Sequence, residues 1–146
     1  MKLVLQRVSE ASVVVQGEMV GKIGQGLVVL LGIASSDTEK ECQKLVDKLV
    51  RLRIFNDSEG KMNLSVSDVQ GQLLVISQFT LYGDCRKGNR PSYMAAASPE
   101  TAKPLYEYFV GRVQAIYPYG VETGIFGANM QVSLVNDGPV TICLES

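Results

Sequence analysis

The chain has 146 residues and a mass of 15.9 kDa, a size that suits one domain able to bury a core without metals or disulfides. Apolar residues make up 46% of it and charged residues 20%, proportions that are typical of a folded globular protein and exclude a disordered one. The net charge of -1 argues against a protein that coats nucleic acid without specificity, but it allows a small basic patch that binds one RNA end.

Two absences narrow the chemistry further. The chain has no histidine, which removes the usual general base and the commonest metal ligand. Its three cysteines, Cys42, Cys85 and Cys143, form no C-x-x-C pair, so we predict no disulfide framework, no metal site and no cofactor. The longest apolar run, residues 27–33, is too short to span a bilayer, and the N-terminus has no signal-peptide core. We therefore expect a soluble, cytoplasmic protein that does not bind membranes.

The first third of the chain is rich in strand-forming residues. Residues 2–8, 11–23 and 26–34 are dominated by Val, Leu and Ile and are separated by glycines, so we predict short strands joined as hairpins. From Ser36 the period changes to that of an amphipathic helix, with apolar residues at 42, 45, 46, 49 and 52. Ser36 and Glu39 predict a capping box at its start, and residues 55–63 a polar turn after it.

A buried strand, a basic loop and a second helix follow. Residues 73–76 predict the buried part of a strand that ends in Ser77-Gln78-Phe79-Thr80, and the loop after it carries Arg86, Lys87 and Arg90. Ser98 as N-cap and Pro99 at the first helical position predict a helix. Its expected inner side comprises Ala102, Leu105, Phe109, Val110, Val113 and Ile116, and Pro104 should bend its start or delay it.

The chain closes with strand-like sequence over residues 120–145, which Asn136-Asp137-Gly138-Pro139 interrupts. Because Pro139 cannot donate to a strand ladder, we expect the run to break there. One interpretation is a hairpin turn, and the other is that a Gly-Pro peptide displayed between strands is itself functional.

The order of elements is strands, helix, strand, helix, strands. It predicts a single domain over residues 1–146 of α/β (α+β) class, with a mostly antiparallel or mixed sheet curled into a barrel-like core and two helices packed outside. Only one crossover unit is apparent, which argues against a doubly wound fold.

No catalytic triad can be assembled from the sequence. Ser77, Thr80 and Cys85 are candidate nucleophiles without a neighbouring base. The carboxylates near the motif segments, Asp84, Glu122 and Asp137, stand singly and are interpreted as solvated turn residues. The remaining option is backbone chemistry, in which Ser77-Gln78-Phe79-Thr80 presents consecutive N–H groups as an oxyanion hole; the alternative is an ordinary strand end.

Four segments in order carry a family resemblance. They are QRVSEASVVVQGEMVGKIGQGLVVLLGI at residues 6–33, SQFTLYGD at 77–84, KGNRPSY at 87–93 and GIFGANMQVSLVNDGPVT at 124–141. Over essentially its whole length the chain resembles the D-aminoacyl-tRNA deacylases of the D-tyrosyl-tRNA deacylase type. Tyr93 is a minor departure, since phenylalanine is common there.

The resemblance implies a homodimer that hydrolyses the ester between a D-amino acid and the terminal adenosine of tRNA. It implies that Gly138-Pro139 is a cis peptide that enters the active site of the other subunit, binds the substrate's ammonium and excludes L side chains. We expect glycyl-tRNA to enter as well, because glycine has no side chain. The expected partners are thus the aminoacylated 3′ end of tRNA and a second copy of the chain, and neither DNA nor a membrane.

The site residues follow from the two motifs and the loop. We expect Ser77, Gln78, Phe79 and Thr80 to form the catalytic segment, with the Phe79 and Thr80 N–H groups as oxyanion donors. The 2′-hydroxyl of the RNA would assist in place of a protein base, and Thr80 as covalent nucleophile is the alternative. Arg86, Lys87 and Arg90 are expected to bind tRNA phosphates. Two rival functions are a non-catalytic dimer that binds an RNA end or ligand, and a synthetase editing module, although the chain looks complete by itself.

Overall fold

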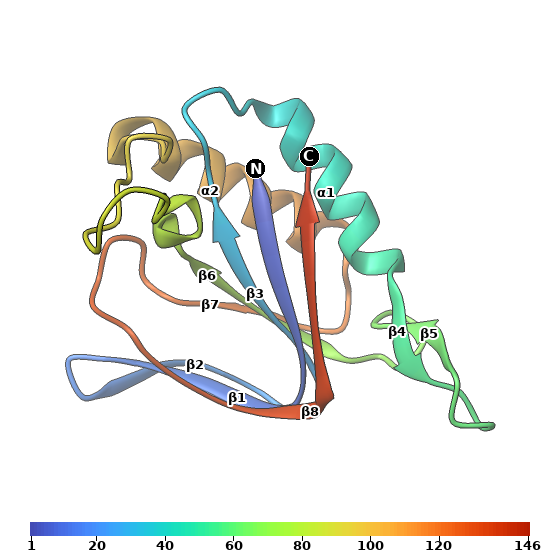
Figure 1. Cartoon of the computed structure of the whole chain (residues 1–146). Helices are drawn as coiled ribbons and strands as arrows, with labels where there is room; N and C mark the ends of the chain where they lie inside the picture. The colour runs from blue at the N-terminus through green and yellow to red at the C-terminus, as the bar shows by residue number, and fades with distance from the viewer.

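The computed structural model describes all residues from 1 to 146 as a curled sheet with two helices against its outer face (Figure 1). The strands are β1 (Lys2–Val15), β2 (Glu18–Ile23), β3 (Gly26–Gly32), β4 (Arg53–Asn56), β5 (Met62–Ser65), β6 (Gln72–Ser77), β7 (Val121–Thr123) and β8 (Gln131–Glu145). The helices are α1 (Glu39–Arg51), α2 (Pro99–Ile116) and the short 3₁₀ helix η1 (Phe79–Tyr82).

The main sheet is mixed, as predicted. Its order is β2-β1-β3-β6-β7, with β8 also paired to β1. The pairs that β1 makes are antiparallel, whereas β3 with β6 and β6 with β7 are parallel. The parallel pairs require two crossovers, through α1 and α2, one more than the sequence indicated. The β4-β5 hairpin, which forms a separate small sheet, was not predicted.

The sheet curls until β2 approaches β7 across the open side. A side chain at Gly21 would lie 3.0 Å from the backbone oxygen of Thr123 and 3.3 Å from the side chain of Leu74, so only glycine allows this approach. The predicted barrel-like core with two outer helices is therefore confirmed.

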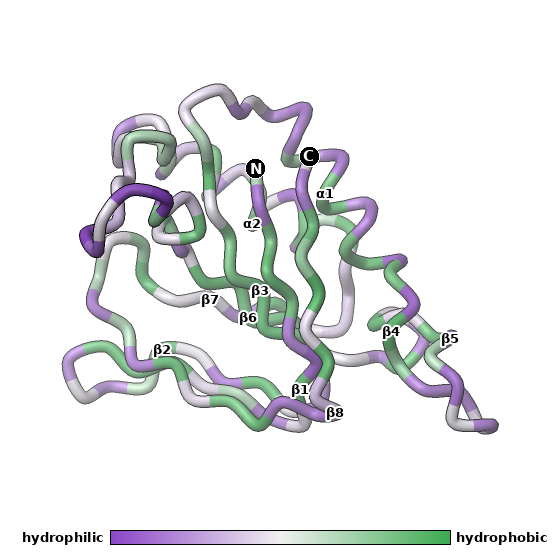
Figure 2. The backbone as a smooth tube through the Cα atoms, in the orientation of Figure 1, coloured by the Kyte–Doolittle hydropathy of each residue, from purple (hydrophilic) through white to green (hydrophobic).

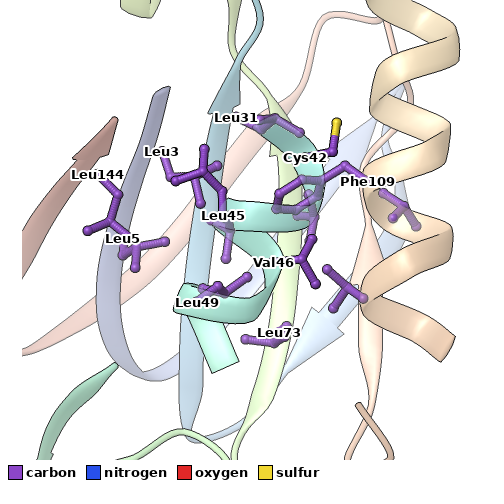
Figure 3. Close-up of a cluster of buried hydrophobic side chains, with 14 of the residues drawn as sticks. Leu3, Leu5, Leu31, Cys42, Leu45, Val46, Leu49, Leu73, Phe109 and Leu144 are labelled. Atoms are coloured by element: carbon purple, nitrogen blue, oxygen red, sulfur yellow. The ribbon is translucent and has the colours of Figure 1, made fainter. Parts of the chain in front are cut away.

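The central strands β3 and β6 are buried on both faces. Leu27, Val29 and Leu31 of β3, like Leu73 and Val75 of β6, belong to the larger core under the helices. The alternate residues of β6, together with Val28 of β3, face a smaller core inside the curl, comprising Val8, Ala11, Val13, Ile23, Val28, Leu74 and Ile76. Figure 3 shows α1 and α2 closing the larger core, with Leu45, Val46, Leu49 and Phe109 placed over strand residues Leu3, Leu5, Leu31 and Leu73.

Helix α1 has the predicted inner face but a different start. Cys42, Leu45, Val46 and Leu49 are buried as predicted. The capping box is formed by Thr38 and Glu41, two residues after the predicted pair Ser36 and Glu39, which was wrong. Asp37 explains the shift, because its carboxylate accepts hydrogen bonds from the Met1 ammonium and from the Ala34 N–H (2.6 Å) and so fixes the preceding turn.

Helix α2 begins as predicted, with Ser98 at the N-cap and Pro99 in the first turn, and it continues through Pro104. Its inner face differs from the prediction at two positions, because Tyr106 is buried whereas Ile116 is 43% exposed. The Tyr106 hydroxyl donates to the Val75 carbonyl oxygen (3.0 Å), and burial raises the pKa of Tyr106 to about 12. The buried face of α2 therefore includes the Tyr106 side chain, whose hydroxyl is satisfied by a buried backbone oxygen.

Strand β1 is longer than predicted. The segments 2–8 and 11–15 form one strand, because β8 pairs with both halves and carries the chain across the exposed residues Ser9 and Glu10. None of the helices is long and apolar enough to cross a membrane. No group of three or more Cys, Asp or Glu side chains is arranged to hold a metal ion.

Candidate functional site

The Ser77-Thr80 segment lies where the buried strand β6 ends. Ser77 is the last residue of β6, and the Gln78 N–H donates to the Leu31 carbonyl oxygen (2.8 Å), which ties the segment to β3. Phe79 and Thr80 open η1, and the first N–H groups of a helix have no acceptor within it. The two N–H groups expected to bind an oxyanion are therefore the two that the local fold leaves free.

Thr80 is exposed and its hydroxyl has one side-chain partner. The Gln78 amide nitrogen donates to the Thr80 hydroxyl oxygen, which leaves the hydroxyl hydrogen free to point elsewhere. No carboxylate or amine hydrogen-bonds this hydroxyl, so it lacks the adjacent base that would activate a nucleophile.

A mostly apolar pocket of about 510 Å³ opens beside this segment. Its lining combines the end of β6 with β3, the start of α2, the loop before β8 and the first part of β8: Leu31, Ile33, Ile76, Ser77, Gln78, Phe79, Ala97, Pro99, Ala102, Phe126, Gly127, Ala128, Asn129, Met130 and Val132. Ser77, Gln78 and Phe79 thus meet in one pocket, while Thr80 lies outside its lining. Residues 126–130 belong to one of the four family segments, but nothing in their pattern predicted that they would form a pocket wall.

The predicted basic loop spans residues 84–92 and is closed by paired backbone hydrogen bonds between Asp84 and Ser92 (2.8 and 2.9 Å). Arg86 donates through Nε and Nη2 to the Asp84 carboxylate (2.9 and 2.7 Å), and this hydrogen bonding lowers the pKa of Asp84. Lys87 and Arg90 are exposed and form no ion pair. Figure 2 shows the loop as a strongly hydrophilic stretch at the left of the molecule. Part of the predicted positive charge is therefore compensated by Asp84.

The Gly138-Pro139 segment interrupts the strand ladder as predicted, but it is not a hairpin turn, so that interpretation was wrong. Strand β8 continues past it, because Asn136 pairs with Val8 and Thr141 with Gln6 on the same partner strand. Residues 137–140 bulge outward opposite the single residue Arg7. The peptide bond between Gly138 and Pro139 is cis, and both residues are exposed.

The bulge is held from below by a residue that sequence reasoning missed. Arg7 is only 6% exposed; its Nε donates to the Asp137 carbonyl oxygen (2.9 Å) and its Nη1 to the Ile54 carbonyl oxygen (2.8 Å). Asn136 adds a second anchor, because its side-chain oxygen accepts from the Val140 N–H (2.9 Å). The alternation of side chains along β1 could have revealed this role. Arg7 continues the inward-facing positions of Leu3 and Leu5, where an unpaired cation is costly.

The bulge and the pocket are separate within one chain. Gly138 and Pro139 do not line the pocket. The bend of β8 lies at the end of the sheet opposite to η1 (Figure 1). One copy of the chain therefore does not bring its two family motifs together.

The cysteines lie apart from both motifs as free thiols. Cys85 and Cys143 are exposed, whereas Cys42 lies on the buried face of α1, where burial raises the pKa of its thiol to about 11. A raised thiol pKa disfavours the reactive thiolate. Of the three, only Cys85 lies near the site, and no base contacts it.

The curled mixed sheet thus leaves backbone N–H groups free at the end of a buried strand, next to an apolar pocket. Donors placed in this way can stabilise developing negative charge in an enzyme. Comparison with known proteins specifies the class. The family model described as D-Tyr-tRNA(Tyr) deacylase matches residues 4–145, and the chain belongs to this family of aminoacyl-tRNA hydrolases.

Curated relatives agree with this membership over the full chain. Proteins named D-aminoacyl-tRNA deacylase are 58% identical in Thermosipho melanesiensis, 59% in Brevibacillus brevis and 60% in Solibacter usitatus. Each match covers 100% of this chain and, in the same order, 97%, 100% and 96% of the relative.

Two solved structures share the fold. A structure described as c-Myc DNA Unwinding Element Binding Protein is 47% identical, with a TM-score of 0.95 and coverage of 100% of this chain and 99% of the other. A second, described as a probable eukaryotic D-amino acid tRNA deacylase, is 18% identical with a TM-score of 0.84, covering 98% and 97% of the two chains, and it supports the fold alone.

Proposed function

We propose that the chain hydrolyses the ester that joins a D-amino acid to the 3′-terminal adenosine of tRNA. Family membership supports the reaction class. The observation that carries the mechanism is the position of the Phe79 and Thr80 N–H groups, which open η1 without acceptors beside an apolar pocket of about 510 Å³. A pocket of this size accommodates a nucleoside-sized ligand.

The reaction needs no protein base in this scheme. Water adds to the ester carbonyl carbon, and the carbonyl oxygen becomes an oxyanion that accepts hydrogen bonds from Phe79 and Thr80. The intermediate collapses by breaking the bond to the ribose 3′ oxygen, which takes up a proton. The products are the free D-amino acid and tRNA with a 3′-hydroxyl. The vicinal 2′-hydroxyl of the substrate is positioned to relay the proton, and an aminoacyl ester is already activated.

Selection against L-amino acids is proposed to require a second copy of the chain. Gly138 and Pro139 lie on an exposed bulge that Arg7 and Asn136 hold in place, away from their own subunit's pocket. In a two-fold homodimer, the same surface of each subunit can reach the other. The bulge of the partner would then bind the substrate's ammonium and occupy the space of an L side chain, while a D side chain points outward and glycine also fits.

The direct test is to incubate the protein with matched D-, L- and glycyl-esters of one tRNA and to measure the amino acid that each ester releases. We expect turnover of the D and glycyl substrates and no measurable turnover of the L substrate. Binding of tRNA without turnover of any ester would support a non-catalytic RNA-binding dimer and contradict the proposal. A synthetase editing module would instead act on an L-aminoacyl ester.

Mixed dimers test whether the bulge acts across the interface. Gly138→Ala should disable the bulge, because the φ of Gly138 is +139° and an added Cβ would lie 2.7 Å from the Val140 side chain. Ala128→Trp should fill the pocket. If the bulge acts in trans, equal mixing of the two inactive variants restores roughly a quarter of wild-type activity, since half the dimers then carry one intact site. No recovery after proven subunit exchange would refute action in trans.

Thr80 is proposed to position water or substrate and not to form an acyl-enzyme. Thr80→Ala should therefore lower turnover without abolishing it, because the positioning hydroxyl is lost while the backbone N–H remains as oxyanion donor. The covalent alternative predicts that Thr80→Ala abolishes turnover, that Thr80→Ser restores it, and that an acylated protein can be trapped by rapid acid quench and detected by mass spectrometry.

A further inference from the structure

The hydrolysis mechanism does not use the side chains of Phe79 and Tyr93, which are exposed and in mutual contact, or of the exposed Met94 that follows Tyr93 in the sequence. Phe79 is 57% exposed, Tyr93 39% and Met94 92%, and we call these three residues the aromatic ledge. The Phe79 and Tyr93 rings meet edge to face, with centroids 5.1 Å apart and an interplanar angle of 68°. This mutual support holds both rings in place while leaving much of their surface to solvent.

The ledge lies between the pocket and the basic loop. Phe79 itself lines the pocket, and Tyr93 directly follows Ser92, whose backbone closes loop 84–92. Gly83 enables the contact, because a side chain there would lie 3.1 Å from the Tyr93 ring and 3.1 Å from the Thr80 carbonyl oxygen. The fold thus places aromatic surface on the route from the exposed cations Lys87 and Arg90 to the reactive amides.

This combination has a specific chemical meaning. Exposed rings next to unpaired cations form the usual binding surface for single-stranded nucleic acid, in which bases stack on aromatic side chains and phosphates contact Lys and Arg. The cations make a single-stranded RNA segment the occupant that fits, since an apolar protein face would gain nothing from Lys87 and Arg90 and would have to desolvate them. Stacking also tolerates any base, as binding to many tRNAs requires.

We propose that the aromatic ledge stacks the base that precedes the terminal adenosine of the tRNA acceptor end. The inference rests on the proposed function, because it assumes that the terminal adenosine lies in the pocket lined by Phe79. Tyr93 and Met94 are then specificity-determining residues for an RNA-linked ester, and they do not take part in bond breaking.

The experiment compares two substrates that differ only in the preceding nucleotides: a D-aminoacyl-tRNA and the same D-amino acid esterified to adenosine alone. The variants are Tyr93→Leu, Met94→Ala and the double variant, with Tyr93→Phe as the conservative variant. Met62→Ala is the matched control, because Met62 is 56% exposed but lies on the separate β4-β5 hairpin. Size-exclusion chromatography is run on each variant.

We expect the double variant to lose kcat/KM on D-aminoacyl-tRNA by about tenfold or more, mainly through a higher KM, as the loss of a stacked base predicts. Its activity on the aminoacyl-adenosine should be unchanged, and Tyr93→Phe and Met62→Ala should match the wild type on both substrates. Equal losses of kcat/KM on both substrates, or no loss on D-aminoacyl-tRNA, would overturn the proposal that the aromatic ledge stacks a base. A change of oligomeric state would also overturn it and assign this surface to a contact between copies. If the wild type hydrolyses neither substrate, the proposed function fails instead.

Discussion

Arg7→Met removes the buried cation beneath the bulge of β8 while keeping an apolar side chain of similar length. The change leaves three acceptors without their donor: the carbonyl oxygens of Asp137 and Ile54, at 2.9 and 2.8 Å, and the side-chain oxygen of Asn56, at 3.2 Å. Each buried acceptor that is left without its donor typically costs about 1–3 kcal/mol. Because methionine avoids the cost of burying a guanidinium, we expect about 3 kcal/mol of lost unfolding free energy.

Urea unfolding at one fixed protein concentration measures this loss. With a slope of about 2 kcal/mol per molar urea, the midpoint should fall by roughly 1.5 M. Arg53→Met is the matched control, because the Arg53 Nε also donates to a backbone oxygen, that of Asn63 (2.9 Å), but does so while exposed to solvent. The control should change the unfolding free energy by about 0.5 kcal/mol or less. A loss under about 1 kcal/mol for Arg7→Met would refute the idea that this cation anchors the bulge.

Three further predictions concern the loop, α2 and the core. Replacing Arg86, Lys87 and Arg90 with Gln should raise KM for aminoacyl-tRNA and reduce the slope of log KM against log salt by roughly 2, with kcat unchanged; an unaltered slope would contradict phosphate binding. Burial raises the pKa of Tyr106 to about 12, so the protonated phenol stabilises the folded state fully below pH 10 and this contribution is lost as the pH rises through about 12. Tyr106→Phe should therefore flatten the fall in stability over that range, as followed by circular dichroism, at a cost of about 1 kcal/mol at neutral pH. Leu49→Ala, at a fully buried position, should cost roughly 3 kcal/mol in urea unfolding with little change in kcat, and a loss below about 1 kcal/mol would contradict its place in the core.

Local signals predicted the helices well, and tertiary contacts decided their details. Ser98 and Pro99 predicted the start of α2 correctly, although the Ser98 side chain makes no capping hydrogen bond to the helix backbone. At α1 two overlapping capping boxes are possible, Ser36 with Glu39 and Thr38 with Glu41. The sequence could not choose between them, since the choice depends on the ion pair between Asp37 and the distant Met1 ammonium.

The predictions of the strand boundaries were wrong for a related reason. The rule that proline interrupts a ladder is correct locally, since residues 137–140 leave the ladder, yet β8 resumes because β1 provides a partner on both sides of the bulge. The exposed pair Ser9 and Glu10 likewise lies in a bend and not at an end of β1. In both cases a long partner strand continues to pair on either side of the irregular residues, so the strand does not end there. The sequence of one strand alone does not show that such a partner exists.

The part of the candidate site that is contiguous in sequence could be predicted. The part that comes from distant segments brought together by the fold could not. Ser77, Gln78 and Phe79 reach the pocket together because one strand end carries them. Ala97 and Ala102 contribute walls without carrying any reactive group, so their role depends on the docking of α2. The pairing of Arg86 with Asp84 was missed because it depends on the turn geometry of the loop.

The burial of β3 and β6 on both faces has a consequence for motion near the site. Amides in strands with no solvent-facing side should exchange with deuterium only through global unfolding, and Ser77 is directly attached to this slowest-exchanging region. Loop 84–92, by contrast, is exposed and closed at its base by one pair of backbone hydrogen bonds, so it can open at a small fraction of the global free energy. In the proposed mechanism, the acceptor end of an RNA would therefore enter and leave past a loop that opens easily, without disturbing the Phe79 and Thr80 amides.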